Sequence, residues 1–139
     1  MMKKVLCVDD DSISLTISKL LLKRTGFAEE VATAIDGSDA LNYFSQVTSD
    51  NSSISAPELV ILDINMPVMN GWEFLDAYVK DYAQKLPGTK VVILSSTIDP
   101  EDFSRAKKFD VVTQFVSKPL SVENLTELKQ NDFVKQFFE

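Results

Sequence analysis

Residues 59–67 read Leu-Val-Ile-Leu-Asp-Ile-Asn-Met-Pro, and this stretch decides the fold. Residues 59–62 are a continuous apolar run rather than an alternating one, which is typical of a strand covered on both faces of a parallel sheet. Asp63 follows the run directly, so its carboxylate is expected at the carboxyl end of the strand. Open parallel sheets bind their ligands at that end. The stretch therefore predicts the type of sheet and the edge at which a site would lie.

Four more segments predict strands around this one. Residues 5–8 and 91–94 are similarly apolar, and a third run starts at 111–112 and continues to 115–116. Residues 28–34 form a weaker candidate that carries two glutamates, so this strand is expected near an edge of the sheet.

Helical segments are expected between the strands. The first is capped by Ser12 or Asp11 and ends at Gly26, and its apolar positions expected to face the sheet are Ile13, Ile17, Leu20 and Leu21. The other four are expected from Asp36-Gly37, after Gly71, from Asp99-Pro100 to Ala106, and from Ser121. Strands that alternate with helices in this way predict right-handed crossovers and an α/β fold with a parallel sheet covered on both sides.

The composition is that of a small acidic domain. The chain has 139 residues, with 14 Lys and Arg against 21 Asp and Glu, and its net charge of −7 argues against nucleic-acid binding. It has no histidine and one cysteine, which excludes Ser-His-Asp and Cys-His nucleophiles, histidine-ligated metals and an intrachain disulfide. No apolar run has the length of a membrane span or of a signal-peptide core, so we expect a cytoplasmic protein with no membrane partner.

Polar side chains follow four of the predicted strands and would meet at one edge of the sheet. They are Asp9 and Asp10 after the first, Asp63 after the third, Ser95 after the fourth and Lys118 after the fifth. Two carboxylates about 4 Å apart repel by about 4 kcal/mol at an effective dielectric constant of about 20, so this cluster requires a cation. All-oxygen ligands suit Mg²⁺. With a lysine and a hydroxyl as donors, the sequence predicts a phosphoryl-transfer site with an aspartate nucleophile.

Each of these residues also has an ordinary structural interpretation. Asp63 alone fits a turn, Ser95 a loop hydroxyl and Lys118 a solvated surface side chain. The functional hypothesis depends on their combination at successive strand ends.

Five separated segments then occur in the same order as in a known family. They are Val-Asp-Asp-Asp-Ser at 8–12, Leu-Asp-Ile-Asn-Met-Pro at 62–67, Asn-Gly at 70–71, Leu-Ser-Ser at 94–96 and Phe-Val-Ser-Lys-Pro at 115–119. Over about residues 3–130 the chain resembles the receiver domain of two-component response regulators. The resemblance implies a single domain over residues 1–139, similar to the stand-alone chemotaxis response regulator, with 131–139 as a helix end or tail. It implies a doubly wound (βα)5, flavodoxin-like three-layer sandwich whose five-stranded parallel sheet has the order 2-1-3-4-5.

The resemblance also implies roles at the acidic edge. Asp63 would be the phosphoacceptor. Asp10 and Asp63 would bind Mg²⁺ through their carboxylates, Asp9 through a water and Asn65 through its backbone carbonyl. Asn65 and Thr97 would flank the path of the attacking water and tune the lifetime of the phosphoryl group.

A second set of implied roles concerns the conformational switch. The hydroxyl of Ser95 would turn toward the phosphoryl group, and Lys118 would bind one of its oxygens. A cis peptide would join Lys118 to Pro119. Phe115 would be the switch aromatic that rotates inward, in a position where the family often has tyrosine.

The predicted function is that of a single-domain response regulator. It would accept a phosphoryl group from a sensor histidine kinase or a histidine phosphotransfer protein, with no enzyme activity beyond its own phosphorylation and dephosphorylation. The fourth helix, fifth strand and fifth helix would present the signal to a downstream protein target, because the chain ends shortly after the fifth helix and we expect no attached output domain. A monomer or weak dimer is expected.

Two alternatives remain open at this point. A haloacid dehalogenase-like aspartyl-phosphate phosphatase would need a second aspartate where Asn65 stands. A receiver-like interaction module would never be phosphorylated.

The remaining features have mainly structural interpretations. Apolar residues resume after Gln130-Asn131-Asp132 at Phe133, Val134, Phe137 and Phe138. Either the last helix continues and packs these rings on the domain, or they form an exposed tail that docks a partner or a second copy. Cys7 is expected in the core, and Trp72 is expected to pack near the site.

Overall fold

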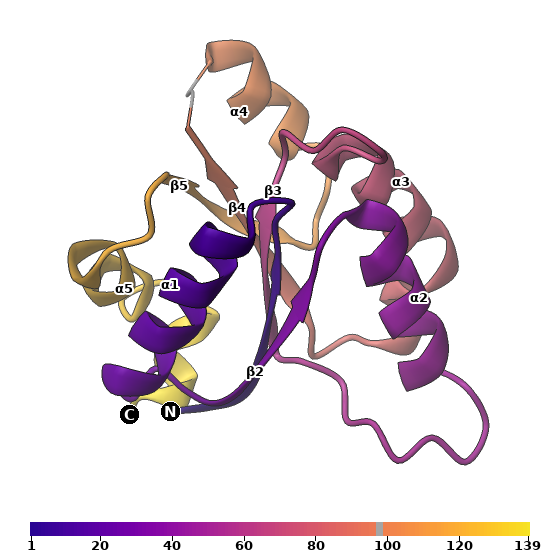
Figure 1. Ribbon diagram of the computed structural model, residues 1–139, viewed down its shortest axis with the longest axis horizontal. Coiled ribbons are helices and arrows are strands. Elements are labelled where there is room, and N and C mark those ends of the chain that lie inside the picture. The colour runs from indigo at the N-terminus through magenta and orange to yellow at the C-terminus, as the bar shows by residue number, and fades with distance from the viewer. Residues whose placement is uncertain (97–98) are drawn as a thin grey trace.

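The computed structural model describes residues 1–96 and 99–139. A five-stranded parallel sheet of order β2-β1-β3-β4-β5 lies at its centre (Figure 1). The strands are β1 Met2–Val8, β2 Ala28–Ala34, β3 Leu59–Asp63, β4 Lys90–Ser95 and β5 Val112–Ser117. The helices are α1 Ser12–Arg24, α2 Gly37–Val47, α3 Gly71–Asp81, α4 Pro100–Ala106 and α5 Val122–Leu128, with short 3-10 helices η1 Ala83–Lys85 and η2 Val134–Phe137. The predicted fold and strand order are confirmed.

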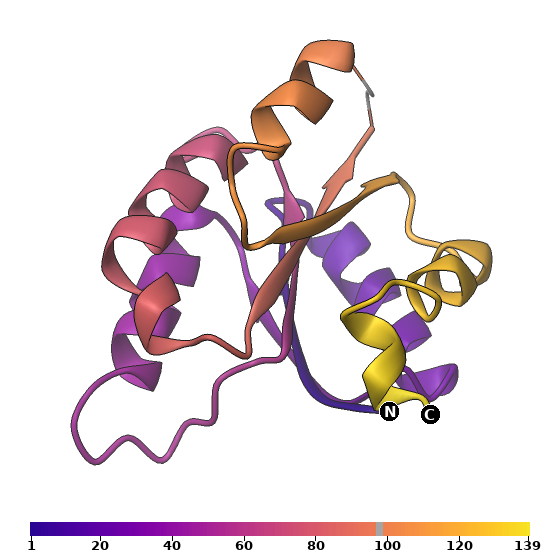
Figure 2. The same cartoon turned by 180° about the vertical axis from the view of Figure 1, so that it is seen from behind.

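Helices cover both faces of the sheet, which explains why its strands are continuously apolar. α1, α5 and η2 lie over one face, and α2, α3 and α4 lie over the other (Figures 1 and 2). Along β1, Val5 and Cys7 belong to the core under α1 and α5, whereas Leu6 and Val8 belong to the core under α2 and α3. Residues 4–8 of β1 are thus buried whichever face they point to. None of the helices in the described part of the chain is long and apolar enough to cross a membrane.

Side chains cap the helices at the predicted positions. Asp36 caps α2, Asp99 caps α4 ahead of Pro100, and Ser121 caps α5. At α1 the cap is Asp11, whose carboxylate accepts hydrogen bonds from the next helical N–H groups, and Ser12 is the first helical residue. Of the two candidates, Asp11 is the cap, because its carboxylate accepts hydrogen bonds from the free N–H groups of Ile13 and Ser14.

The face of α1 that packs on the sheet is not the predicted one. Ile13, Ile17 and Leu20 are 69%, 54% and 49% exposed, and of the predicted residues Leu21 packs against the core. The buried residues are Leu15, Ser18 and Leu22. Both sets recur at helical spacing, because apolar residues occupy two stripes of this helix. The prediction chose the more apolar stripe, whereas the sheet covers the one that includes a serine.

The last segment departs from the predicted continuous helix. α5 ends at Leu128, and a separate 3-10 turn, η2, begins at Val134, whose N–H donates to the Asn131 side chain. Val134 is fully buried, and Phe133, Phe137 and Phe138 pack against the core, with the Phe138 ring 5.0 Å from that of Phe27. The packing of the rings on the domain is confirmed, and the exposed tail is wrong. The two ends of the chain meet here (Figure 2), where the Met1 amino group donates a hydrogen bond of 2.6 Å to the Phe137 carbonyl.

Candidate functional site

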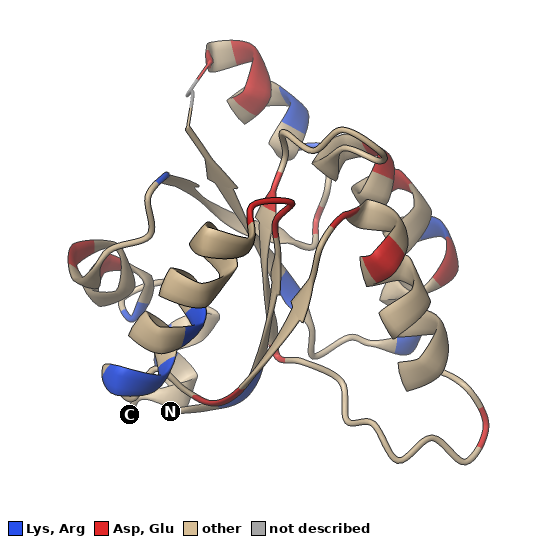
Figure 3. Cartoon of the chain, viewed as in Figure 1, with Lys and Arg blue, Asp and Glu red and all other residues tan. Residues whose placement is uncertain are grey.

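The ends of four neighbouring strands bring the predicted site residues together. Asp9 follows β1, Asp63 ends β3, Ser95 ends β4 and Lys118 follows β5. Because the strands are parallel and adjacent, these ends share one edge of the sheet. Figure 3 shows acidic residues at the end of β1 and at the neighbouring end of β3.

Three carboxylates form a cluster at this edge. Oxygens of Asp9, Asp10 and Asp63 lie within 4.8 Å of one another. Asp9 and Asp63 are buried, at 4% and 3% exposure, and Asp10 is exposed. Such a cluster of like charges is unfavourable unless cations offset it.

Lys118 supplies one such cation. Its Nζ lies 2.8 Å from Asp9 Oδ2 and 3.2 Å from Asp63 Oδ2, so one ammonium bridges both buried carboxylates. Burial lowers the pKa of Lys118, but the hydrogen bond to Asp9 and the charges of Asp63 and Asp9 outweigh it and raise the pKa above its ordinary value. The lysine is therefore held as a cation between the two aspartates.

Backbone N–H groups hold the other oxygen of each buried carboxylate. The Asp11 N–H donates to Asp9 Oδ1 at 2.9 Å, and the Asn65 N–H donates to Asp63 Oδ1 at 3.0 Å. Burial raises the pKa of Asp63, with the Asp9 charge acting in the same direction, while the Asn65 N–H and Lys118 oppose the shift. Asp63 is thus a partly desolvated carboxylate in a fixed orientation.

Gly71 positions the Asp63 loop, a role that the sequence prediction missed. A Cβ at Gly71 would lie 2.7 Å from the Cα of Ile64 and 3.1 Å from the Asp63 carbonyl oxygen. The Gly71 N–H also donates to the Ile64 carbonyl at 3.1 Å, and Asn70 caps α3 in a capping box with Glu73. Because residue 71 is a glycine, α3 can start in contact with the loop that follows Asp63. A glycine at the first position of a helix after the Asp63 loop is the sequence signal of this close contact.

Ser95, one of the two residues that the resemblance assigns to the switch, ends a strand at the same edge as the cluster. Ser95 is fully buried, and its backbone carbonyl accepts the Lys118 N–H at 2.8 Å. The Lys118–Pro119 peptide is cis, as the resemblance implied. Phe115 is half-buried, and its ring lies 4.7 Å from that of Phe103 on α4. Thr97 lies outside the described residues.

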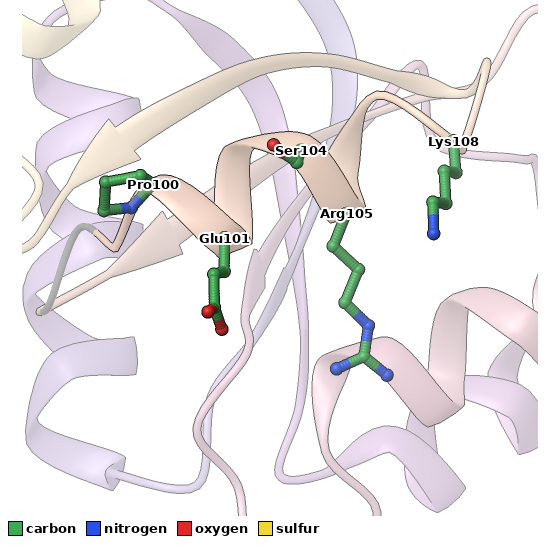
Figure 4. Close-up of a pocket in the computed structure, with 5 residues that line it drawn as sticks. All are labelled: Pro100, Glu101, Ser104, Arg105 and Lys108. Atoms are coloured by element: carbon green, nitrogen blue, oxygen red, sulfur yellow. The ribbon is translucent and has the colours of Figure 1, made fainter.

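A shallow hollow of about 420 Å³ runs along α4, apart from the acidic cluster. Its lining residues are Pro100, Glu101, Ser104, Arg105 and Lys108, and Arg105 reaches from α4 toward α3 (Figure 4). The Arg105 guanidinium lies 4.8 Å from the ring of Trp72, which also stacks on Phe109. Trp72 is buried and packs near the site, as predicted.

The acidic cluster has the chemistry of a Mg²⁺ site. Its donors are carboxylate oxygens only, and Asp10 leaves one of them open to solvent. Among the described residues, Lys118 is the one cation in an ion pair with Asp9 or Asp63. The three carboxylates of the cluster, which include Asp10, therefore face one positive charge. A hard divalent cation that keeps several waters fits this donor set.

Comparison with known proteins agrees with the fold. The family model described as the response regulator receiver domain matches residues 5–130. A two-component response regulator from Cytophaga hutchinsonii has a similar structure, with a TM-score of 0.84 and 30% identity over 99% of this chain and 98% of that one. The chemotaxis protein CheY4 of Vibrio cholerae gives a TM-score of 0.74 and 30% identity over 94% of this chain and 98% of that one.

A curated relative shows the same segment inside a much longer protein. The chain is 29% identical over 126 residues to the hybrid signal transduction histidine kinase L of Dictyostelium discoideum, which is 90% of this chain and 7% of that protein. The chain therefore spans a small part of the length of this relative. Because the sequence match and the structural likeness both extend over nearly the whole chain, the protein belongs to the family of response regulator receiver domains.

Proposed function

We propose that Asp63 accepts a phosphoryl group from a phosphohistidine of a sensor histidine kinase or a histidine phosphotransfer protein, and that the chain acts as a switch. The observation that carries this proposal is the Lys118 ammonium, 2.8 Å and 3.2 Å from two buried carboxylates at the strand ends. Structural aspartates rarely stay buried as a pair, so this arrangement indicates a reaction site.

In the transfer step, an oxygen of the Asp63 carboxylate attacks phosphorus while the bond from phosphorus to the histidine nitrogen breaks. The bonding electrons leave with the imidazole. A Mg²⁺ ion held by Asp9, Asp10, Asp63 and the Asn65 carbonyl would neutralise charge on the phosphoryl oxygens. Lys118 already faces the attacking carboxylate, so it can donate to a phosphoryl oxygen without a large movement.

The added charge of about −1.5 to −2 is what switches the domain. Ser95 ends β4 beside the acceptor and supplies the hydroxyl that turns toward the phosphoryl group. The space that this hydroxyl leaves is open to the ring of Phe115, which moves inward from its contact with Phe103. The face formed by α4, β5 and α5 then changes shape, and a downstream protein target binds it.

The exposed stripe of α1 supports a docking surface for the histidine-bearing partner. Ile13 lies two residues after the cap Asp11, so the stripe begins at the acidic cluster and continues through Ile17 and Leu20 toward Lys23 and Arg24 at the far end of the helix. A partner helix with an apolar seam, a histidine near one end and acidic residues near the other fits this surface in shape and charge.

The central test is phosphorylation by a small donor. The purified chain is incubated with Mg²⁺ and an acyl phosphate or phosphoramidate, and its intact mass is measured. We expect one phosphoryl group on the wild type and on the exposed control Asp76→Asn, and none on Asp63→Asn or without Mg²⁺. Labelling of Asp63→Asn, or none on the wild type, would refute the proposal, and the second outcome would favour an interaction module that is never phosphorylated.

The docking surface has a separate test. Ile17→Ser should slow phosphotransfer from a histidine phosphotransfer protein while leaving the rate with the small donor unchanged, because Ile17 is 54% exposed and is not a member of the carboxylate cluster. Equal loss with both donors would contradict the docking role. The phosphatase alternative has no support at the site, since Asn65 occupies the position that would need a second aspartate.

A further inference from the structure

One side chain joins the C-terminal segment, residues 130–138, to the edge strand β5. The Asn131 amide nitrogen donates to the Thr113 carbonyl at 3.3 Å and to Gln114 Oε1 at 2.9 Å. Its oxygen accepts from the Thr113 hydroxyl at 3.1 Å, and from the N–H groups of Phe133 at 2.9 Å and Val134 at 3.3 Å. Asn131 therefore binds β5 with one set of bonds and starts η2 with another.

The strand side of this junction is the irregular part of the sheet. β5 pairs with β4 alone, and the pairing shifts there, because Val91 faces Val112 whereas Val92 faces Gln114. Thr113 is the extra residue of this bulge, and its carbonyl and hydroxyl are the groups that Asn131 binds. The Asn131 side chain thus hydrogen-bonds to the bulge residue on the edge of β5, where the pairing with β4 is irregular.

The other side of the junction is firmly packed. Val134 is fully buried, the Phe138 ring lies 5.0 Å from the Phe27 ring, and Lys129 Nζ lies 4.9 Å from the Phe138 ring. The family match ends at residue 130, whereas the structural likeness to the Cytophaga hutchinsonii regulator covers 99% of this chain. The segment packs on the core and bonds to β5.

We propose that Asn131 couples the packing of the C-terminal segment to the position of β5, so that the docked segment favours the unphosphorylated arrangement of the switch. Phe115 follows Gln114 directly, and β5 leads on to Lys118. The hydrogen bonds of Asn131 fit the present position of Thr113 and Gln114, and a shift of β5 would lengthen them. The link to phosphorylation rests on the proposed function, whereas the link between the segment and β5 does not.

Asn131→Asp separates the two halves of the junction. The aspartate keeps an oxygen for the Phe133 and Val134 N–H groups but turns an oxygen instead of an amide toward the Thr113 carbonyl. The matched control is Gln136→Ala, because Gln136 Nε2 donates at 2.6 Å to the Phe133 carbonyl and so acts inside the segment only.

The first arm measures amide hydrogen exchange in the unphosphorylated chain. We expect Asn131→Asp to speed exchange about tenfold or more in residues 112–116 and in 133–138 together, as expected for the loss of the two hydrogen bonds that the Asn131 amide nitrogen donates. Gln136→Ala should speed exchange in 133–138 alone. If Asn131→Asp leaves either 112–116 or 133–138 unchanged, the coupling is refuted, whatever the outcome for the proposed function.

The second arm repeats the measurement on the wild type with Mg²⁺ and a small phosphoryl donor, with the intact mass measured on the same samples. Exchange in 133–138 should rise about fivefold on phosphorylation, a typical coupling between two sites. By reciprocity, loosening the segment with Asn131→Asp should raise the equilibrium constant for phosphorylation, by at most the same factor. A phosphorylated chain with unchanged exchange overturns the link to the switch. An unlabelled chain overturns the proposed function and with it that link, while the first arm still decides the link to β5.

Discussion

Replacing Gly71 by alanine adds one methyl group where α3 touches the loop after Asp63. The new Cβ would lie 2.7 Å from Ile64 Cα, 2.8 Å from Ile64 Cγ2 and 3.1 Å from the Asp63 carbonyl oxygen. The nearest of these atoms belongs to the backbone, so the clash cannot be relieved by a side-chain rotation, and overpacking of this kind costs about 1–3 kcal/mol. Alanine recovers about 0.4–1 kcal/mol by restricting the unfolded chain. We expect the free energy of unfolding to fall by about 1–2 kcal/mol.

Two other glycines serve as controls for this substitution. Neither Gly88 nor Gly26 has an atom within 4 Å of its Cβ position, but Gly26 has a φ of +69°. Gly88→Ala should therefore be neutral or stabilising, and Gly26→Ala should lose about 1 kcal/mol through left-handed strain alone.

The assay is urea denaturation followed by circular dichroism, where a loss of 1–2 kcal/mol shifts the midpoint by about 0.5–1 M. The same proteins are labelled with the small phosphoryl donor. Gly71→Ala alone should lower the labelling rate, by about tenfold or more, because a small displacement of a reacting group has a large effect on rate. If Gly71→Ala has the urea midpoint and the labelling rate of the wild type, the close approach of α3 does not position Asp63 and the reasoning is wrong.

Three further predictions concern charge, thiol chemistry and α1. In the presence of a chelator, Lys118→Met should lower the free energy of unfolding by about 2–3 kcal/mol, because it leaves Asp9 and Asp63 buried without a cation. Urea denaturation measures this loss, and excess Mg²⁺ should recover part of it. Equal stability of the variant and the wild type in the chelator would contradict the bridging role. Burial raises the pKa of the Cys7 thiol to about 12. Ellman's reagent should therefore fail to react with the folded protein at about pH 8 and react fully in denaturant, and fast native labelling would be inconsistent with this environment. Ile17→Ser should change the free energy of unfolding by less than about 0.5 kcal/mol, whereas Leu22→Ala should cost about 2–5 kcal/mol, and the reverse order would show that the faces of α1 are misassigned.

Much of the fold and the candidate site could be predicted from local sequence. The apolar runs that became β1, β3 and β4 are continuous because helices bury both faces, so each run indicated a parallel sheet by itself. Once the strands are parallel and adjacent, Asp9, Asp63 and Lys118 must meet at one edge. That inference needed only the order of the segments along the chain.

Three features could not be predicted in this way. The apolar pattern of α1 contains two stripes, and the choice of Leu15 and Leu22 over Ile13 and Ile17 depends on the sheet beneath the helix. The contact of Gly71 with Ile64 depends on the angle at which α3 leaves the loop. The fate of the last aromatic residues depends on Phe27 and on β5.

The sequence by itself determined the class of sheet, the edge that carries the chemistry and the residue types gathered there, because burial periodicity and strand-end position are local properties. Only the tertiary structure decided that Lys118 bridges Asp9 and Asp63, that one stripe of α1 is left exposed, and that Asn131 fastens the last segment to β5. These depend on contacts between residues far apart in the chain, such as the 55 positions that separate Asp63 from Lys118. Such contacts leave no periodic signal in a single sequence.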